Sequence, residues 1–216
     1  MVILSVSDIV RPALYSKTTP QRFADVDLVI GCGDLPYYYL EFIADALNAP
    51  VMYVHGNHDA LKEYRDDGTR SAPMGAVNVH RRVMMHEGII FAGLEGSMRY
   101  RDGKYMYTDR QMWLMVFLMV PKLIWNRLLH GRFIDILVTH SPPAGIHDRA
   151  DLPHQGFSAI HWLIQTFRPR IHVHGHIRLM HGDAIEAMLG KTRIINTYGY
   201  QRIEFEREQQ GKKADE

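Results

Sequence analysis

The chain has 216 residues, and we expect a single domain over residues 1–206 followed by a charged tail at 207–216. The charges of its 25 basic and 24 acidic side chains nearly cancel, so the overall charge does not indicate binding to nucleic acid or to an anionic membrane. The one cysteine, Cys32, excludes an internal disulfide. Residues 1–7 lack the basic start and cleavage site of a signal peptide, so we expect a cytoplasmic protein.

The first part of the chain alternates short apolar runs with one helical segment. Residues 2–6, 27–30 and 51–54 are apolar runs that end in polar residues, a pattern typical of buried strands. Residues 36–47 have helical spacing, with Pro36 at the first turn. This β-loop-α-β order predicts a partly parallel sheet. We expect residues 59–77, which are polar and contain Gly and Pro, to be a surface loop.

The second part adds more strands and two helices. Residues 83–85 and 88–94 predict a hairpin, and 97–107, rich in Arg and Tyr, predicts a loop beside a substrate cleft, with Arg99 a weak candidate contact. Thr108 and Gln111 match a capping box that opens a helix ending at about residue 129. The remaining expected elements are strands 134–138 and 171–174, a helix 157–167, and two strands, 192–198 and 201–206, which we expect to pair antiparallel because their link is short.

The helix at 109–129 is unusual because residues 112–120 are nine apolar residues in succession. Nine is far fewer than the roughly 20 residues needed to cross a bilayer. One interpretation is a helix buried between a sheet and other elements. The others are a homodimer contact or a membrane-surface contact. The sequence leaves these alternatives open.

Five of the predicted strands end in a polar side chain that can bind a metal. Because open α/β sheets place ligands at the carboxyl ends of their strands, these residues are candidates for one site. Oxygen ligands together with imidazoles suit a divalent ion such as Mn, Fe or Zn. The strand-end residues are Asp8, Asp34, Asn57 with His58 and Asp59, His140 and His176.

In order and spacing these residues resemble the motifs of the calcineurin-like metallophosphoesterases. The most specific piece is Gly56-Asn57-His58-Asp59 following Gly33-Asp34, and the resemblance extends from residue 2 to about residue 197. It implies a four-layer α/β/β/α sandwich of two mixed β-sheets flanked by helices. It also implies a phosphoesterase, more specifically a phosphodiesterase, that hydrolyses a small-molecule phosphate ester with metal-activated water.

The resemblance also implies roles for individual residues. Asp34 would bridge two metals, Asp8 would belong to the first metal, and Asn57, His140 and His176 would complete the shell of the second. His58 would lie beside the phosphoryl group and assist the leaving group, and Asp59 would orient His58. Asn57 and Arg178 are the candidate contacts for the substrate.

Two positions depart from the family pattern. Val10 stands where the first motif, Asp-x-His, has its histidine, and Arg178 stands where the last motif, Gly-His-x-His, has its second. In the family, both of the missing histidines are ligands of the first metal. We therefore expect one tightly held ion, with Arg178 close to Asp8 or to substrate phosphate. The alternatives are that Arg178 faces solvent while Asp8 caps a turn, or that two ions bind with other side chains as stand-ins.

Other classes of function are alternatives to the phosphoesterase. A weakened site would suit a binding or scaffold protein, as in the retromer subunit of similar fold. The series His172, His174 and His176, which on a strand would share one face, is compatible with a zinc amidohydrolase-like site. A dinucleotide site at Gly31 and Gly33 is excluded because no third glycine follows. The substrate, metal identity and oligomeric state are not predicted.

Overall fold

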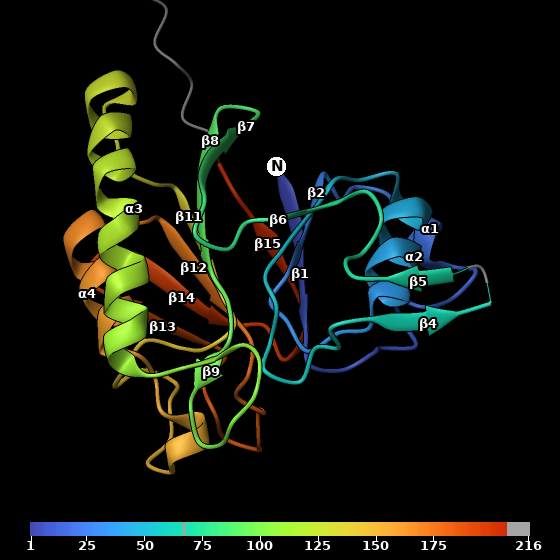
Figure 1. Cartoon of the computed structure of the whole chain (residues 1–216). Coiled ribbons are helices and arrows are strands. Elements are labelled where there is room, and N and C mark those ends of the chain that lie inside the picture. Colours follow the sequence, from blue (N-terminus) through green and yellow to red (C-terminus); the bar gives the residue numbers. More distant parts are fainter. Residues whose placement is uncertain (67, 207–216) are drawn as a thin grey trace, which may run out of the picture.

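The computed structural model describes residues 1–66 and 68–206, which form two β-sheets packed face to face with helices on both outer faces (Figure 1). In the first sheet the order is β15-β1-β2-β3-β6. Its strands are β1 (Val2–Ser7), β2 (Leu28–Gly31), β3 (Val51–Tyr53), β6 (Ala76–Asn78) and β15 (Gly199–Glu204). Within it, β1, β2, β3 and β6 are parallel and β15 is antiparallel to β1.

The second sheet has the order β13-β14-β12-β11-β8-β7. Its strands are β7 (Val83–His86), β8 (Ile89–Leu94), β11 (Ile136–Thr139), β12 (Ile171–His174), β13 (Glu186–Leu189) and β14 (Thr192–Asn196). The four central strands are parallel, and β7 and β13 close the two edges in the antiparallel sense. Both sheets are therefore mixed, and the four-layer sandwich expected from the sequence is confirmed.

Helices cover the outer face of each sheet. The first sheet carries α1 (Thr19–Arg22) and α2 (Tyr37–Leu47), and the second carries α3 (Asp109–His130) and α4 (Ser158–Phe167). Three apolar clusters separate the layers: one between the sheets, around Phe91 and Val173, and one beneath each pair of helices. Strands buried on both faces have to be apolar throughout, which explains the uninterrupted apolar runs in the sequence.

The expected pairing of the last two strands is wrong. β14 lies in the second sheet beside β12 and β13, whereas β15 lies in the first sheet beside β1. The short link through Thr197 and Tyr198 therefore carries the chain from one sheet to the other instead of forming a hairpin. Thr197 is fully buried at this crossing, where its N–H donates to the carbonyl oxygen of His174.

Two segments expected to be loops contain short strands. The first holds a hairpin of β4 (Glu63–Arg65) and β5 (Gly68–Arg70), followed by β6 at the sheet edge, and the second holds the pair β9 (Ser97–Met98) and β10 (Met106–Tyr107). A 3₁₀ turn, η1 (Leu152–His154), was also not predicted. These pieces are too short and polar to show a strand period in the sequence. The charged tail lies outside the described residues.

The capping box at Thr108 forms as predicted. The Thr108 hydroxyl accepts from the Gln111 N–H at 3.3 Å, and the Gln111 side chain accepts from the Thr108 N–H at 2.9 Å. The interpretation of this helix as buried between a sheet and other elements is wrong, because one face of α3 packs in the core whereas the opposite face is exposed.

Candidate metal centre

Side chains from both sheets meet at the edge where the parallel strands end. Asp8 follows β1, Asp34 follows β2, and Asn57 follows β3 in the first sheet, while His140 follows β11 and His176 follows β12 in the second. Asp8, Asp34 and His176 have positive φ angles of 65°, 57° and 67°. This left-handed backbone is unfavourable for residues other than glycine, and such strain concentrates at functional sites.

Close backbone packing between the loops depends on two glycines. A Cβ on Gly56 would lie 2.6 Å from Asp34 Cγ, and a Cβ on Gly33 would lie 2.7 Å from His140 Nδ1. Either methyl group would push apart the strand-end loops that carry Asp34 and His140. Glycine at these positions therefore allows the side chains of the cluster to converge.

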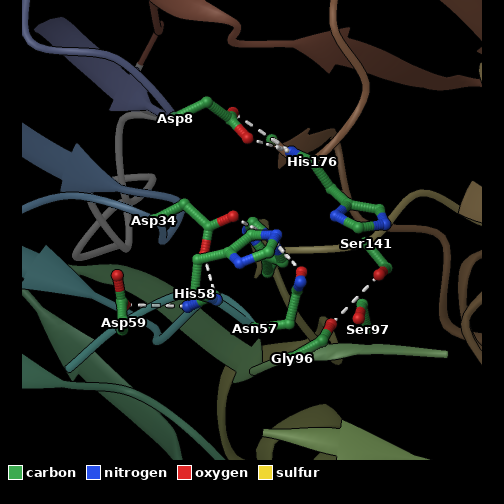
Figure 2. A network of polar contacts seen from close by, with 12 residues as sticks. Asp8, Asp34, Asn57, His58, Asp59, Gly96, Ser97, Ser141 and His176 are labelled. Atoms are coloured by element: carbon green, nitrogen blue, oxygen red, sulfur yellow. Dashed lines mark hydrogen bonds and ion pairs between the residues drawn. The ribbon is translucent and has the colours of Figure 1, made fainter. Parts of the chain in front are cut away.

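Asp34, Asn57, His140 and His176 form one compact cluster, of which Figure 2 labels Asp34, Asn57 and His176. His140 Nε2 lies 3.0 Å from Asn57 Oδ1 and 3.4 Å from Asp34 Oδ2. The rings of His140 and His176 have centroids 4.8 Å apart, and ligand atoms of Asp34, His140 and His176 all lie within 4.8 Å of one another. His140 is fully buried, and Asn57 and His176 are 7% and 8% exposed, so the cluster is largely shielded from solvent.

Hydrogen bonds to the backbone orient both imidazoles. His140 Nδ1 lies 2.7 Å from the carbonyl oxygen of Cys32, so Nδ1–H donates and Nε2 faces the cluster. His176 Nε2 lies 2.7 Å from the carbonyl oxygen of Pro153, so Nε2–H donates and the lone pair of Nδ1 is left for another partner. Metal-ligating histidines have the same arrangement, in which the second ring nitrogen donates to a carbonyl or a carboxylate.

The charges of the cluster depend on burial and on one close pair. Burial opposes the imidazolium form of His140, but the Asp34 carboxylate outweighs burial and raises the pKa of His140 to about 9. Burial also acts to raise the pKa of Asp34, but His140 outweighs it and lowers the pKa to about 2. Burial, assisted by His140, lowers the pKa of His176 to about 3, so His176 is neutral and available as a ligand.

The residues of the cluster fit a divalent cation. When His140 is neutral, its Nε2 and Asn57 Oδ1 direct lone pairs at each other across 3.0 Å, which is favourable only with a positive charge between them. Among the described residues Asn57 Nδ2 is buried without a hydrogen-bond partner, and Oδ1 faces His140 Nε2, where a cation would lie between the two atoms. The ligand set is one carboxylate, one amide oxygen and two imidazoles, which suits Mn, Fe or Zn.

In the part of the chain that the structure describes, no first metal site is assembled around Asp8. Both carboxylate oxygens of Asp8 lie 3.1 Å from the His176 N–H donor, and the Val10 side chain packs against the apolar cluster beneath α1 and α2. Arg178 is exposed, and in the described part of the chain its side chain makes no hydrogen bond or ion pair with Asp8. Of the expected ligands, Asp34, Asn57, His140 and His176 are brought together, whereas Asp8 braces the backbone of one of them.

His58 lies at the mouth of the cluster. Its backbone N–H donates to Asp34 Oδ1 at 2.7 Å, and its side chain is exposed, close enough to Asp34 to help hold the pKa of that carboxyl down (Figure 2). The expected contact between Asp59 and the His58 ring is not made among the described residues. Instead, Asp59 accepts from the Leu35 N–H at 2.9 Å and from the Gly56 N–H at 2.8 Å, and so holds the Asp34 and Asn57 loops together.

Replacing Asp59 with alanine is expected to lower the free energy of unfolding by about 2 kcal/mol, because two buried N–H groups lose their acceptor. Burial, with the Asp34 carboxylate, raises the pKa of Asp59 to about 7. Because this folded-state pKa lies above that of an aspartate in the unfolded chain, Asp59 favours folding most at low pH, and this contribution is lost as the pH rises through 7. Urea unfolding of both proteins at pH 5 and pH 8 tests the prediction, and unchanged stability would contradict the bracing role.

Several contacts at the site could not be predicted from residue type. The acceptors for His140 and His176 are the backbone carbonyls of Cys32 and Pro153, and any residue could supply them. His154, whose ring centroid lies 5.3 Å from that of His176, comes from the same unpredicted 3₁₀ turn as Pro153. The one feature of the sequence that could have indicated a role for this segment is the number of His and Asp residues between 147 and 154.

The expectation that His172 and His174 share a face with His176 is wrong. β12 ends at His174, and the left-handed backbone at His176 breaks the alternation of the strand. His172 Nε2 lies 2.7 Å from Thr139 Oγ1, and His174 Nε2 lies 2.9 Å from His147 Nδ1. Burial lowers the pKa of both residues, and they form a neutral polar layer outside the metal cluster.

A buried network behind the Asn57 turn was also not predicted. Glu95 accepts from Tyr107 at 2.7 Å and lies 3.1 Å from His55 Nδ1, and the His55 ring stacks on Tyr105 with centroids 4.4 Å apart. Arg99, a weak candidate for substrate contact, donates to Met106 O at 3.3 Å and Gln111 Oε1 at 3.2 Å. It therefore fixes the loop against the start of α3.

Comparison with known proteins agrees with this geometry. The model of the family described as calcineurin-like phosphoesterase matches residues 1–178. The chain belongs to this family. A search of curated proteins finds no match. As a calcineurin-like phosphoesterase, the chain comes from a family of metal-dependent enzymes, and the matched range contains all the strand-end residues described above.

Solved structures share the fold at low sequence identity. The protein TT1561 of Thermus thermophilus is 17% identical with a TM-score of 0.59, and the match covers 92% of this chain and 89% of that one. An archaeal phosphodiesterase is 14% identical with a TM-score of 0.42 and coverages of 94% and 99%. Vps29 from Entamoeba histolytica is 14% identical with a TM-score of 0.38 and coverages of 92% and 74%. These likenesses concern the fold alone.

Proposed function

We propose that this calcineurin-like phosphoesterase hydrolyses a small-molecule phosphodiester at a centre that holds one divalent ion. The observation that carries the proposal is the convergence of Asp34, Asn57, His140 and His176 directly beneath an exposed histidine, His58. When bound, such an ion supplies positive charge for phosphoryl oxygens and lowers the pKa of a water molecule. The protein residues must then hold the ion, position the ester and move a proton.

Three of the four ligand residues are held by hydrogen bonds to the backbone, which suits a centre that must not rearrange during reaction. Asp34 accepts from the His58 N–H, and the two imidazoles donate to backbone carbonyls. Asp59 and the two close-packed glycines hold the loops at a fixed spacing. Positioning and electrostatic stabilisation account for most of the catalysis in phosphoryl transfer, so this rigidity supports the proposed activity.

His58 is the proposed proton donor to the leaving oxygen. Its imidazole is exposed at the mouth of the cluster, and its backbone N–H donates to the carboxylate of the ligand Asp34. An imidazole placed this way can donate a proton as the ester bond breaks. Arg178, exposed on the loop after His176, is the proposed contact for a substrate phosphate oxygen, because a guanidinium can bind two such oxygens at once.

One ion rather than two is proposed because the described residues around Asp8 do not provide a second set of ligands. Val10 is packed in an apolar cluster, and the Asp8 carboxylate accepts from the His176 N–H through both oxygens. Asp8 then acts by orienting the His176 backbone. The incomplete first metal site around Asp8 also favours a second candidate function, that of a binding or scaffold protein without hydrolytic activity.

Replacing His58 with alanine is expected to lower kcat for a nitrophenyl phosphodiester with Mn²⁺ by about 100-fold, because the proton donor is lost. Metal affinity should not change, since the His58 side chain is outside the proposed ligand set. The assay compares the wild type, H58A and H130A, a control that removes an exposed histidine at the far end of α3. A wild type that is inactive with Mn²⁺, Fe²⁺ and Zn²⁺ would instead support the scaffold function.

A further inference from the structure

The helix α3 has two apolar faces, and only one of them is used by the fold. The inner face packs into the core against the second sheet and α4, and its buried apolar residues are at most 3% exposed. The outer face is open to solvent and carries two apolar groups, at 114–118 and 124–129, with Pro121 and Lys122 between them. Its members, here called the outer stripe, are Leu114 (60% exposed), Phe117 (53%), Leu118 (59%), Ile124 (47%), Trp125 (58%), Leu128 (72%) and Leu129 (58%).

This arrangement is not that of an ordinary surface helix, which turns a polar face to water. Figure 1 shows α3 beside α4 on one outer side of the molecule, and the exposed fractions of its outward residues show that no described element covers them. Several large apolar side chains exposed together along one helix indicate an interaction site. The outer stripe therefore needs an occupant.

Crossing a membrane is not a suitable role for α3, although its length and composition would allow it. The inner face contributes Met112, Val116, Met119 and Leu123 to the cluster beneath α3 and α4. Withdrawing the helix into a bilayer would expose that cluster. A helix that keeps its inner face on the protein can meet a bilayer only by lying along its surface.

The charges around the outer stripe are basic. Residues 110–134 contain Arg110, Lys122, Arg127 and Arg132 and no acidic side chain. The acidic residues that border this segment are engaged: Asp109 accepts from Ser158 Oγ at 2.5 Å, and Asp135 accepts from Arg132 Nε at 2.8 Å. The nearly neutral total charge of the chain hides this local excess, which complements an anionic lipid surface.

A pocket of about 380 Å³ lies where α3 ends. Its lining includes the guanidinium-bearing residues Arg127, Arg132, Arg168 and Arg170, together with Asp135. Arg132 is held by Asp135, and Arg170 donates to the carbonyl oxygen of Glu206 at 2.7 Å, whereas Arg127 and Arg168 are exposed. Exposed guanidinium groups beside an apolar helix face match a lipid phosphate above its acyl chains.

A second copy of the chain is a poorer occupant. A stable protein interface takes about 20–30 residues from each partner, and the outer stripe has seven members. Two α3 helices packed face to face would also bring basic residues against basic residues, with no acidic side chain from 110 to 134 to offset them.

We propose that α3 binds the surface of an anionic phospholipid membrane. The outer stripe lies in the boundary between headgroups and acyl chains, and Trp125 reaches the interfacial level that tryptophan favours. Arg127 and Arg168 bind lipid phosphates at the C-terminal end of the helix. This interaction goes beyond the proposed hydrolysis and does not depend on it.

Co-sedimentation with vesicles tests the proposal on the full chain. The probes are phosphatidylcholine vesicles with and without about 30% phosphatidylglycerol, and the variants are L118E/W125E, R127Q/R168Q and a matched control, M74E/M188E. Met74 and Met188 are 60% and 59% exposed and lie outside α3, so the control places the same new charges elsewhere. All substituted positions are exposed, and circular dichroism checks that each variant is folded.

The wild type and the control are expected to bind the anionic vesicles at least tenfold more tightly than the neutral ones. We expect L118E/W125E to lose this binding, and R127Q/R168Q to weaken it by about tenfold or more, at roughly 1 kcal/mol for each basic residue. Equal binding of L118E/W125E and wild type, or no binding of the wild type to either vesicle, would overturn the proposal. A wild-type dimer in light scattering that L118E/W125E converts to monomer would also overturn it, in favour of a second copy.

Discussion

Replacing Asp34 with asparagine is expected to lower kcat/KM for a phosphodiester by about 1,000-fold, because the variant holds the cation less tightly and so loses the positive charge that would stabilise the transition state. Asp34 is the one carboxylate among the four clustered ligands, and its oxygen lies 3.4 Å from His140 Nε2. Asparagine keeps the shape and one oxygen but removes the negative charge that attracts the cation. The measurement is a steady-state assay with Mn²⁺, together with the metal content of the purified variant.

The matched control is D45N, which makes the same chemical change at an exposed position on α2. It should retain wild-type activity and metal content. An active D34N protein with normal metal content would show that the cluster around His140 is not the metal centre.

The second large effect is a dependence of metal affinity on pH. Asp34 raises the pKa of His140 to about 9, so near neutral pH His140 carries a proton that a metal must displace. Metal affinity should therefore rise by about tenfold for each pH unit between pH 6 and pH 8 and level off near pH 9. The pKa of Asp34 is about 2 and that of His176 about 3, so neither residue contributes a proton over this range.

Titration calorimetry in two buffers of different ionisation enthalpy measures this effect and should show one proton released per Mn²⁺ bound at pH 7. In the variant H140A the pH dependence should disappear along with most of the affinity. A wild-type affinity that does not change between pH 6 and pH 8 would mean that His140 binds no proton in the metal-free protein.

The sequence was most informative where a strand ends. A strand buried on both faces must be apolar, so a polar residue directly after it stands out, and Asp34, Asn57, His140 and His176 could all be identified in this way. The parallel order of the strands then explains why these residues reach the same edge. The capping box at Thr108 was equally readable, because it is local in the chain.

Features that depend on tertiary position could not be predicted. The link after β14 is as short as a hairpin link, yet it crosses between sheets because β15 pairs with β1, nearly 200 residues earlier. The turn of His176 away from the face of β12 depends on a left-handed backbone that its residue type does not favour. The apolar run in α3 could be assigned a buried and an exposed face only when its packing partners were known.

The central claim is a single metal ion held by Asp34, Asn57, His140 and His176, and metal stoichiometry tests it most directly. Native mass spectrometry and elemental analysis of protein purified without chelators should give one tightly bound ion per chain. This stoichiometry should persist in D8N, which keeps an oxygen to accept from the His176 N–H, and should be lost in H140A. Two tightly bound ions in the wild type, or a loss of metal in D8N equal to that in H140A, would contradict the claim.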